Sequence, residues 1–166
     1  MVALHHSPHI AAIHVRDLGP ADEALVERLH HSLSPRSQYQ RFHGAKPRLT
    51  PRELRFLAGA DGRDHVALMA LERGEPVAIA RYVRLKDRPH AADVAAEVID
   101  DRQRQGLGTG LIRRLAKRAA AAGVERFTAT VLSETGLRAA LTRRGWSITG
   151  VDGPTTTLEA PVWALL

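Results

Sequence analysis

The chain has 166 residues, of which 44% are hydrophobic and 25% charged, a composition typical of a globular protein that can bury a core as one domain. Cysteine is absent, which excludes disulfides, thiolate metal sites and a cysteine nucleophile. The formal charge of +6 could suit nucleic acid, but only 4% of the residues are aromatic and basic residues are spread along the whole chain, so we expect no nucleic-acid partner.

No apolar run approaches the roughly 20 residues that span a bilayer, and the first residues lack the continuous apolar segment of a secretory signal. We therefore expect a cytoplasmic protein without a membrane partner, as a monomer or a homodimer. Residues 1–9 are interpreted as a flexible tail before one domain, residues 10–166. The histidines of this tail have neither a carboxylate partner nor helical spacing, so no metal site is predicted at His5, His6 and His9.

The first part of the domain is expected to be mainly helical. Residues 10–18 resemble a strand, and Gly19-Pro20 then begins a helix, because Pro suits the first helical position and acidic residues follow it. Ser34-Pro35 predicts a short further turn of helix as far as Phe42. Residues 50–53 (Thr-Pro-Arg-Glu) form a capping box with Pro at the first position, which predicts a third helix start.

The rest of the chain alternates between strand and helix patterns. The predicted elements are strands at 65–72, 76–85 and 92–100, a helix at 105–122, a strand at 124–132, a helix at 134–144 and a closing hairpin at 146–151 and 155–165. The order β-α-α-β-β-β-α-β-α-β-β indicates a mixed α/β fold. An antiparallel meander precedes one βαβ unit, so the fold is not a repeated Rossmann unit.

The start of helix 105–122 is glycine-rich, with the sequence Gln-Gly-Leu-Gly-Thr-Gly at residues 105–110. Glycines let backbone N–H groups approach an anion closely, and the helix dipole favours phosphate at the same place. Short glycine-rich helix starts are common, but this one joins the fourth strand to the longest helix. We predict a pyrophosphate site there, surrounded by the basic residues Arg102, Arg104, Arg113, Arg114, Lys117 and Arg118.

These features resemble the GNAT superfamily of acetyl-CoA-dependent N-acetyltransferases. The family signature, Arg/Gln-x-x-Gly-x-Gly/Ala, is present at residues 103–108. The closer resemblance is to the GNAT domains of bacterial protein lysine acetyltransferases, on three segments: residues 33–42 (LSPRSQYQRF), 131–134 (VLSE) and 143–146 (RRGW). The resemblance implies a GNAT fold, in which the central sheet splays between strands 4 and 5, and acetyl-CoA as the co-substrate.

The resemblance also implies how the cofactor is held. The pantetheine arm would lie in the gap between the splayed strands, held by backbone groups around Val98 and Ile99. Backbone N–H groups of the glycine-rich turn would bind the pyrophosphate, and the residues implied are Gln103, Arg104, Gln105, Gly106, Leu107, Gly108 and Thr109. Ser133 or Thr135 could bond the pantetheine, although helix capping would also explain Ser133.

Acetyl transfer to a primary amine needs a base, since an ordinary lysine has a pKa of about 10.4. A carboxylate within hydrogen-bond reach, directly or through one water, can accept the proton. Asp93 and Glu97 lie four residues apart on the fourth strand, so an ideal strand places both on one face. The bulge usual in this family would break that parity. By resemblance, Asp93 matches the Glu that serves as base in the protein acetyltransferase branch, and Glu97 is the competing candidate; either could instead be solvated or paired with an arginine.

The chain departs from the family pattern at two positions. Thr135 stands where many members have Asn, and Leu141 stands where many have the Tyr that protonates the departing thiolate. A thiolate leaves tolerably without help, so the general acid is unassigned; Tyr39 and Tyr82 could lie near the cleft, but packing is the expected role of each. The leading hypothesis is an N-acetyltransferase acting on a protein lysine or a small amine. The alternative is a non-catalytic acyl-CoA-binding regulatory domain.

Overall fold

The computed structural model describes residues 12–166. The expected tail at residues 1–9, with its three histidines, and the first residues of the strand expected from residue 10 lie outside this part. The elements in chain order are β1 (Ile13–Asp17), α1 (Glu23–Ser32), α2 (Pro35–Phe42), α3 (Pro51–Ala58), β2 (His65–Glu72), β3 (Glu75–Arg84), β4 (Ala91–Val98), α4 (Leu107–Ala121), β5 (Arg126–Leu132), α5 (Gly136–Arg143), β6 (Ser147–Asp152) and β7 (Thr155–Pro161). The predicted mixed α/β class is confirmed. The segment expected as one short helical turn is the separate eight-residue helix α2.

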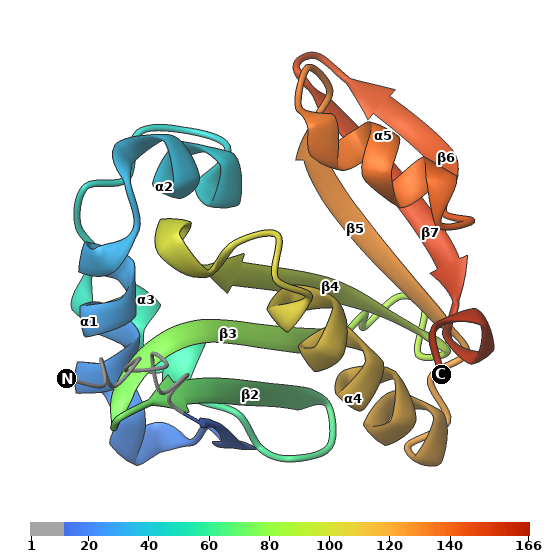
Figure 1. The fold of residues 1–166 in the computed structure, drawn as a ribbon. Coiled ribbons are helices and arrows are strands. Elements are labelled where there is room, and N and C mark those ends of the chain that lie inside the picture. Colours follow the sequence, from blue (N-terminus) through green and yellow to red (C-terminus); the bar gives the residue numbers. More distant parts are fainter. Residues whose placement is uncertain (1–11) are drawn as a thin grey trace, which may run out of the picture.

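The seven strands form one sheet in the order β1-β2-β3-β4-β5-β7-β6. All neighbours are antiparallel except β4 and β5, which are parallel and pair only from Ala91↔Arg126 to Asp93↔Thr128. Beyond this point the two strands diverge (Figure 1). The splay that the family resemblance implies is therefore present. Within the described residues, the β5 side of β4 has no ladder partner after Asp93.

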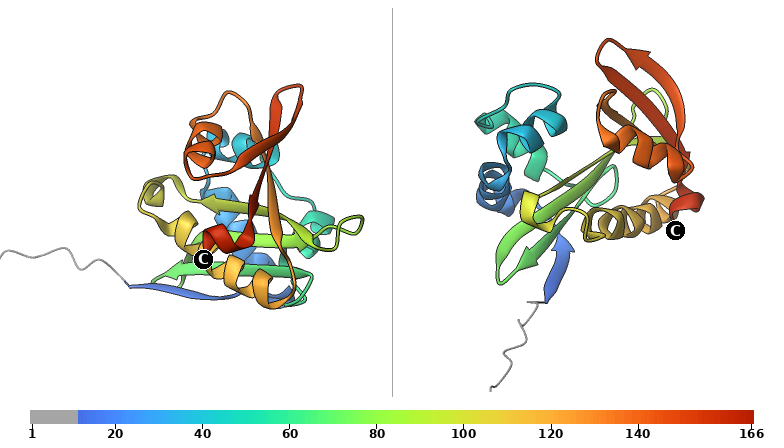
Figure 2. Two further views of the ribbon diagram at one scale, coloured as in Figure 1. Left: turned by 90° about the vertical axis from the view of Figure 1, so that its right-hand side faces the viewer. Right: turned by 45° about the horizontal axis from the view of Figure 1, so that its top comes forward.

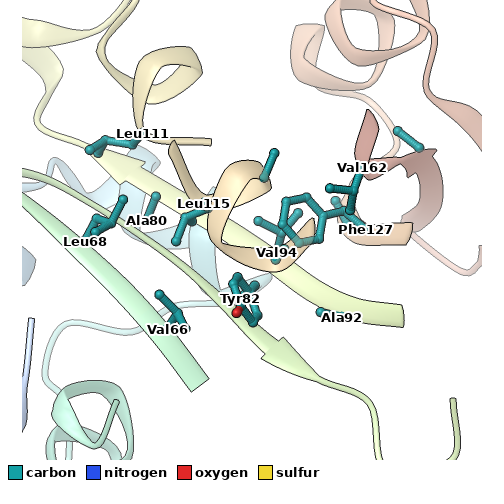
Figure 3. Close-up of a cluster of buried hydrophobic side chains, with 14 of the residues drawn as sticks. Val66, Leu68, Ala80, Tyr82, Ala92, Val94, Leu111, Leu115, Phe127 and Val162 are labelled. Carbon is teal, nitrogen blue, oxygen red and sulfur yellow. The ribbon is translucent and has the colours of Figure 1, made fainter. Parts of the chain in front are cut away.

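Alternation along the strands divides the core between the two faces of the sheet. One face of the β1–β4 part packs against α4, and α1 and α3 lie against the other face (Figure 2). The α4 side buries Tyr82, Ala92 and Val94 against Leu111 and Leu115 (Figure 3). Since Ala92 and Val94 belong to this cluster, the odd-numbered residues of β4 face the side of α1 and α3.

On that second side α3 begins where the sequence predicts, whereas the helix expected from Gly19-Pro20 starts as a 3-10 turn, Pro20–Asp22, and becomes α-helical at Glu23. The Thr50 hydroxyl accepts a hydrogen bond from the N–H of Glu53 at 3.3 Å, and the Glu53 carboxylate accepts one from the N–H of Thr50 at 2.7 Å. This confirms the predicted capping box, which satisfies two N–H groups that a helix start otherwise leaves without partners. The Ser34 hydroxyl caps α2 in the same way, accepting from the N–H of Ser37.

Candidate active site

The glycine-rich turn is folded as an open helix start. Gly106 is the N-cap residue of α4 and has φ 81°, a left-handed conformation that favours glycine. No side chain caps the first N–H groups of α4, and such groups at a helix start attract anions. The two glycines differ, because a Cβ at Gly108 would meet Val98 Cγ2 at an ordinary 3.5 Å. The backbone conformation therefore requires glycine at position 106 more strictly than at 108.

Side chains of the loop that precedes α4 form hydrogen bonds that stabilise the conformation of this loop. Gln103 donates from Nε2 to the Ser37 hydroxyl at 3.1 Å and to the Val98 carbonyl at 3.0 Å. Gln105 donates to the Asp101 carbonyl at 3.0 Å. Backbone groups of Ile99 are also bonded within the protein: its N–H donates to Val77, and its carbonyl accepts from Arg102. The two glutamines are thus structural parts of the loop in this state.

The start of α2 is fastened to the same loop by Asp100, a residue that the sequence analysis did not single out. The Asp100 carboxylate accepts from the N–H of Ser34 at 3.0 Å and from its hydroxyl at 2.8 Å. These bonds to the ionised form lower the pKa of Asp100. The Leu-Ser-Pro-x-Ser motif therefore places α2 against the turn that precedes α4.

The prediction that six basic residues surround the anion site is corrected. Arg118 forms a salt bridge with Asp17 at 2.9 Å, eleven residues or about 16 Å along α4 from its start. Arg102 forms a salt bridge with Glu72 at 2.6 Å, which balances its charge. The other four basic residues form no salt bridge with any residue of 12–166. They are Arg104, Arg113, Arg114 and Lys117.

Both candidate bases lie on the same face of β4. The pairing of β3 with β4 runs without a register shift from Ala78↔Val98 to Arg84↔Ala92. The expected bulge is therefore absent from this pairing, and the simple parity of an ideal strand holds. Val83 is the cross-strand partner of Asp93, and Ile79 is the partner of Glu97.

Glu97 is a buried ion-pair residue. Its side chain lies between two guanidinium groups, with Arg41 Nε 3.5 Å from Oε2 and Arg81 Nη2 3.5 Å from Oε1. Arg81 is only 3% exposed and also donates from Nη1 to the Leu57 carbonyl. Burial lowers the pKa of Arg81 to about 10, against the opposing effect of Glu97. The sequence left open whether Glu97 is solvated or paired with an arginine. In the structure it pairs with both Arg41 and Arg81.

Asp93 instead lines an open cleft of about 500 Å³. The cleft lies between α2, α3, β3 and β4, and its other lining residues are Arg41, Phe42, Glu53, Phe56, Leu57, Arg81, Val83, Leu85 and Ala95. The Asp93 side chain is exposed, yet desolvation by the surrounding walls raises its pKa, partly offset by the positive charges of Arg41 and His43. A carboxylate with raised pKa accepts a proton more readily. This cleft can take an elongated, largely apolar group that ends in an amine.

The remaining predicted residues are placed as follows. The Ser133 hydroxyl bonds the Thr156 hydroxyl at 2.7 Å, and the Thr135 hydroxyl donates to the Leu132 carbonyl at 2.7 Å. Thr135, not Ser133, precedes the first residue of α5, so the capping interpretation of Ser133 is wrong. Tyr82 is fully buried and packs against Phe127, as expected, whereas Tyr39 is 48% exposed on α2 rather than packed.

His43 is a site residue that the sequence did not reveal. It is the C-cap of α2, with φ 55°, and its Nε2 lies 3.1 Å from the Thr130 carbonyl of β5. Thr130 is two residues beyond Thr128, the last β5 residue that pairs with β4. The imidazole therefore reaches β5 where the two strands separate. The only signal in the sequence was a His-Gly pair after a predicted helix end.

Residues 26–146 match the model of the Acetyltransferase (GNAT) family. The chain belongs to this family. The assignment agrees with the splayed sheet, the open start of α4 and the motif at residues 103–108. GNAT acetyltransferases use acetyl-CoA as the acetyl donor, in agreement with the predicted co-substrate.

The chain is also similar to individual proteins of known sequence or structure. It is 35% identical over 103 residues to Acetyltransferase Pat of Mycolicibacterium smegmatis, a match covering 61% of this chain and 31% of that protein. The chain thus spans about a third of the length of this curated relative. Its fold is similar to the crystal structure of the GNAT domain of S. lividans PAT, with TM-score 0.82 and 24% identity over 95% of this chain and 99% of that one. A PaiA N-acetyltransferase from Thermoplasma acidophilum, solved with coenzyme A, has TM-score 0.68 and 11% identity over 90% and 99% of the two chains.

Two further properties concern residues 12–166. None of the helices there is long and apolar enough to cross a membrane. No group of three or more His, Asp or Glu side chains in that part of the chain is arranged to hold a metal ion.

Proposed function

We propose that the chain transfers an acetyl group from acetyl-CoA to a primary amine, with Asp93 as the general base. The observation that carries the proposal is the position of Asp93: it lines the cleft and is also the last β4 residue that pairs with β5. A base at this point faces the acceptor on one side and the start of the gap between the strands on the other. Glu97 is less suited, because it is not among the residues that line the cleft and each of its carboxylate oxygens pairs with a guanidinium group.

The proposed donor site joins the gap to the start of α4. Backbone groups of β4 after Asp93, as far as Val98, have no ladder partner on the β5 side and would pair with the amides of pantetheine. Ile99 would contribute mainly through its side chain, because its own N–H and carbonyl are already bonded. The pyrophosphate would then meet the N–H groups of Leu107, Gly108 and Thr109, with the guanidinium of Arg104 nearby in the chain.

The reaction follows from this arrangement. The acceptor ammonium loses a proton to Asp93, directly or through a water, since Asp is one methylene shorter than the Glu of the related enzymes. The neutral nitrogen attacks the thioester carbonyl carbon, and backbone N–H donors stabilise the resulting oxyanion. The C–S bond then breaks, leaving an N-acetyl amine and coenzyme A.

For the acceptor we propose the side chain of a protein lysine. The motif at residues 33–42 and the match to Acetyltransferase Pat support this class. The cleft supports it as well, because its apolar walls, including Phe42 and Phe56, suit a chain of methylenes and Asp93 offers a carboxylate to the amine. A small-molecule amine is the alternative acceptor.

Thiol release from acetyl-CoA, measured with lysine peptides, folded proteins and small amines, tests the proposal. Asp93→Asn is expected to lower transfer about 10²- to 10⁴-fold, because the base is lost, while Asp93→Glu keeps activity. The acid limb of the wild-type pH profile should lie above the ordinary Asp range, since desolvation raises the pKa of Asp93. The exposed Asp152→Asn is the matched control.

Leu141 is the observation that favours the second candidate, a non-catalytic acyl-CoA-binding domain. It packs against the hydrophobic core on α5 and offers no acid. Binding of coenzyme A without thiol release on any amine would favour that alternative and refute catalysis.

A further inference from the structure

The proposed reaction leaves a thiolate that no residue of α5 can protonate, because Leu141 is packed against the core. A proton donor for the sulfur has to stand beside the gap between β4 and β5, just past the Asp93↔Thr128 pair where the strands separate. His43 is the titratable side chain that the structure brings to this point, through its contact with Thr130.

The backbone of His43 is held in an unusual conformation. Its φ of 55° and ψ of 30° lie in the left-handed region, which few non-glycine residues occupy. The two preceding residues are anchored elsewhere: the Phe42 ring packs edge-on against His30 at 5.3 Å, and Arg41 pairs with Glu97. With both neighbours fixed, the end of α2 directs the imidazole to β5 rather than to the core. Such conformations often mark functional positions.

The contact with Thr130 determines the protonation of the ring. A carbonyl oxygen only accepts hydrogen bonds, so the 3.1 Å contact requires a proton on Nε2. Nδ1 makes no hydrogen bond to any residue within 12–166. In the protonated imidazole, Nδ1 carries a second proton that is available for transfer, while the bond to Thr130 keeps the ring in place.

His43 and Asp93 both lie near the point where β4 and β5 separate. The positive charge of His43 stabilises the ionised Asp93 and opposes the rise in the pKa of that carboxyl. Asp93 stands on β4 and pairs with Thr128, and His43 at the end of α2 contacts Thr130, two residues further along β5. An acid and a base so arranged can serve the leaving sulfur and the attacking nitrogen separately.

We propose that His43 is the general acid that protonates the sulfur of coenzyme A; this rests on the proposed acetyl transfer. The acceptor ammonium gives one proton to Asp93, which passes it to water; the neutral nitrogen then forms a bond to the carbonyl carbon and gives its second proton to the Asp93 carboxylate. The C–S bond breaks, its electron pair goes to sulfur, and the sulfur takes the Nδ1 proton. Asp93 and His43 return to their starting states by exchanging protons with water.

The first test uses the wild-type protein and requires no acceptor. The titration of the His43 ring is followed by nuclear magnetic resonance in the presence of coenzyme A and of desulfo-coenzyme A, which lacks only the sulfur. If Nδ1 faces the sulfur, the thiol interacts directly with the ring, and the titration of His43 differs between coenzyme A and desulfo-coenzyme A. Identical titrations with the two ligands would overturn the proposal.

The second test uses His43→Gln, whose side-chain amide can still donate to the Thr130 carbonyl but cannot transfer a proton. Transfer should fall about 10²-fold, the low end for general acids because a thiolate leaves readily, and the alkaline limb of the pH profile should disappear. Thermal protection by coenzyme A should remain. The same change at the exposed His31 of α1 is the control. It should leave the transfer rate, the alkaline limb and the thermal protection unchanged.

The outcomes separate the two proposals. Full transfer by His43→Gln with an unchanged alkaline limb would show that His43 only braces α2 against β5. Absence of thiol release by the wild type with every amine would overturn the proposed function and the catalytic role together. Loss of activity in Asp93→Asn but not in His43→Gln would refute the acid and retain the base.

Discussion

Replacing Glu97 by Gln separates the structural carboxylate of β4 from the catalytic one. The change leaves the charges of Arg41 and Arg81 facing each other without their counter-ion. Arg41 Nε and Arg81 Nη2 are buried and have no hydrogen-bond partner even in the wild type. Removing one member of a buried ion pair costs about 3–5 kcal/mol, since an uncompensated charge remains.

The lower end of this range applies, because both contacts of Glu97 are 3.5 Å long. A loss of about 3 kcal/mol lowers the melting temperature by about 6–12 °C in a protein of this size, at about 2–4 °C per kcal/mol. The assay is thermal unfolding followed by circular dichroism. Asp93→Asn makes the same change four residues away on the same face, at an exposed position, and should melt within about 2 °C of the wild type.

The two variants should therefore show opposite effects. Glu97→Gln should lose stability and keep most of its acetyl transfer below its melting temperature, whereas Asp93→Asn should keep stability and lose transfer. If Glu97→Gln melts like the wild type and loses transfer as severely as Asp93→Asn, Glu97 is the base and the ion-pair reasoning is wrong.

Two further predictions concern the start of α4 and the capping box of α3. Gly106→Ala should cost about 1–2 kcal/mol in the free energy of unfolding, because its φ of 81° disfavours a Cβ, whereas Gly108→Ala should be neutral or stabilising; equal melting temperatures would contradict this. Hydrogen bonds from Lys46 and Thr50 lower the pKa of Glu53 to about 2. Its contribution to stability is therefore present above its unfolded pKa and lost as pH falls from about 4.5 to 2. When the free energy of unfolding is measured against pH, Glu53→Gln should reduce the loss of stability over that pH range. An unchanged curve would refute the assignment.

Local patterns in the sequence were enough to predict most of the fold. The capping box at Thr50 and the glycine-rich turn at Gly106 act within a few residues, so their physics is visible in a short segment. The same holds for the shared face of Asp93 and Glu97, which follows from the two-residue period of a strand. The proposed donor site is built mainly from neighbours in the chain, so the sequence could propose it for the same reason, and its residues stay a prediction.

The catalytic details depend on contacts between distant segments, which no local pattern contains. Glu97 is held in an ion pair by Arg41 of α2. His43 is placed beside β5 by its contact with Thr130, which lies 87 residues further along the chain. The charge of Arg118 is balanced by Asp17, 101 residues away. Charge counting along one segment therefore overstated the basic surroundings of the anion site.

The short contact between β4 and β5 also affects how the molecule loses structure. Among residues 12–166, only three ladder pairs join the β1–β4 part of the sheet to β5, β7 and β6. Backbone hydrogen bonds thus form two ladders with a weak junction, and each ladder can open with its own free energy. The shared core around α4 still joins the two parts. A donor molecule lying in the gap would add a second connection, so the loaded protein should unfold more cooperatively than the empty one.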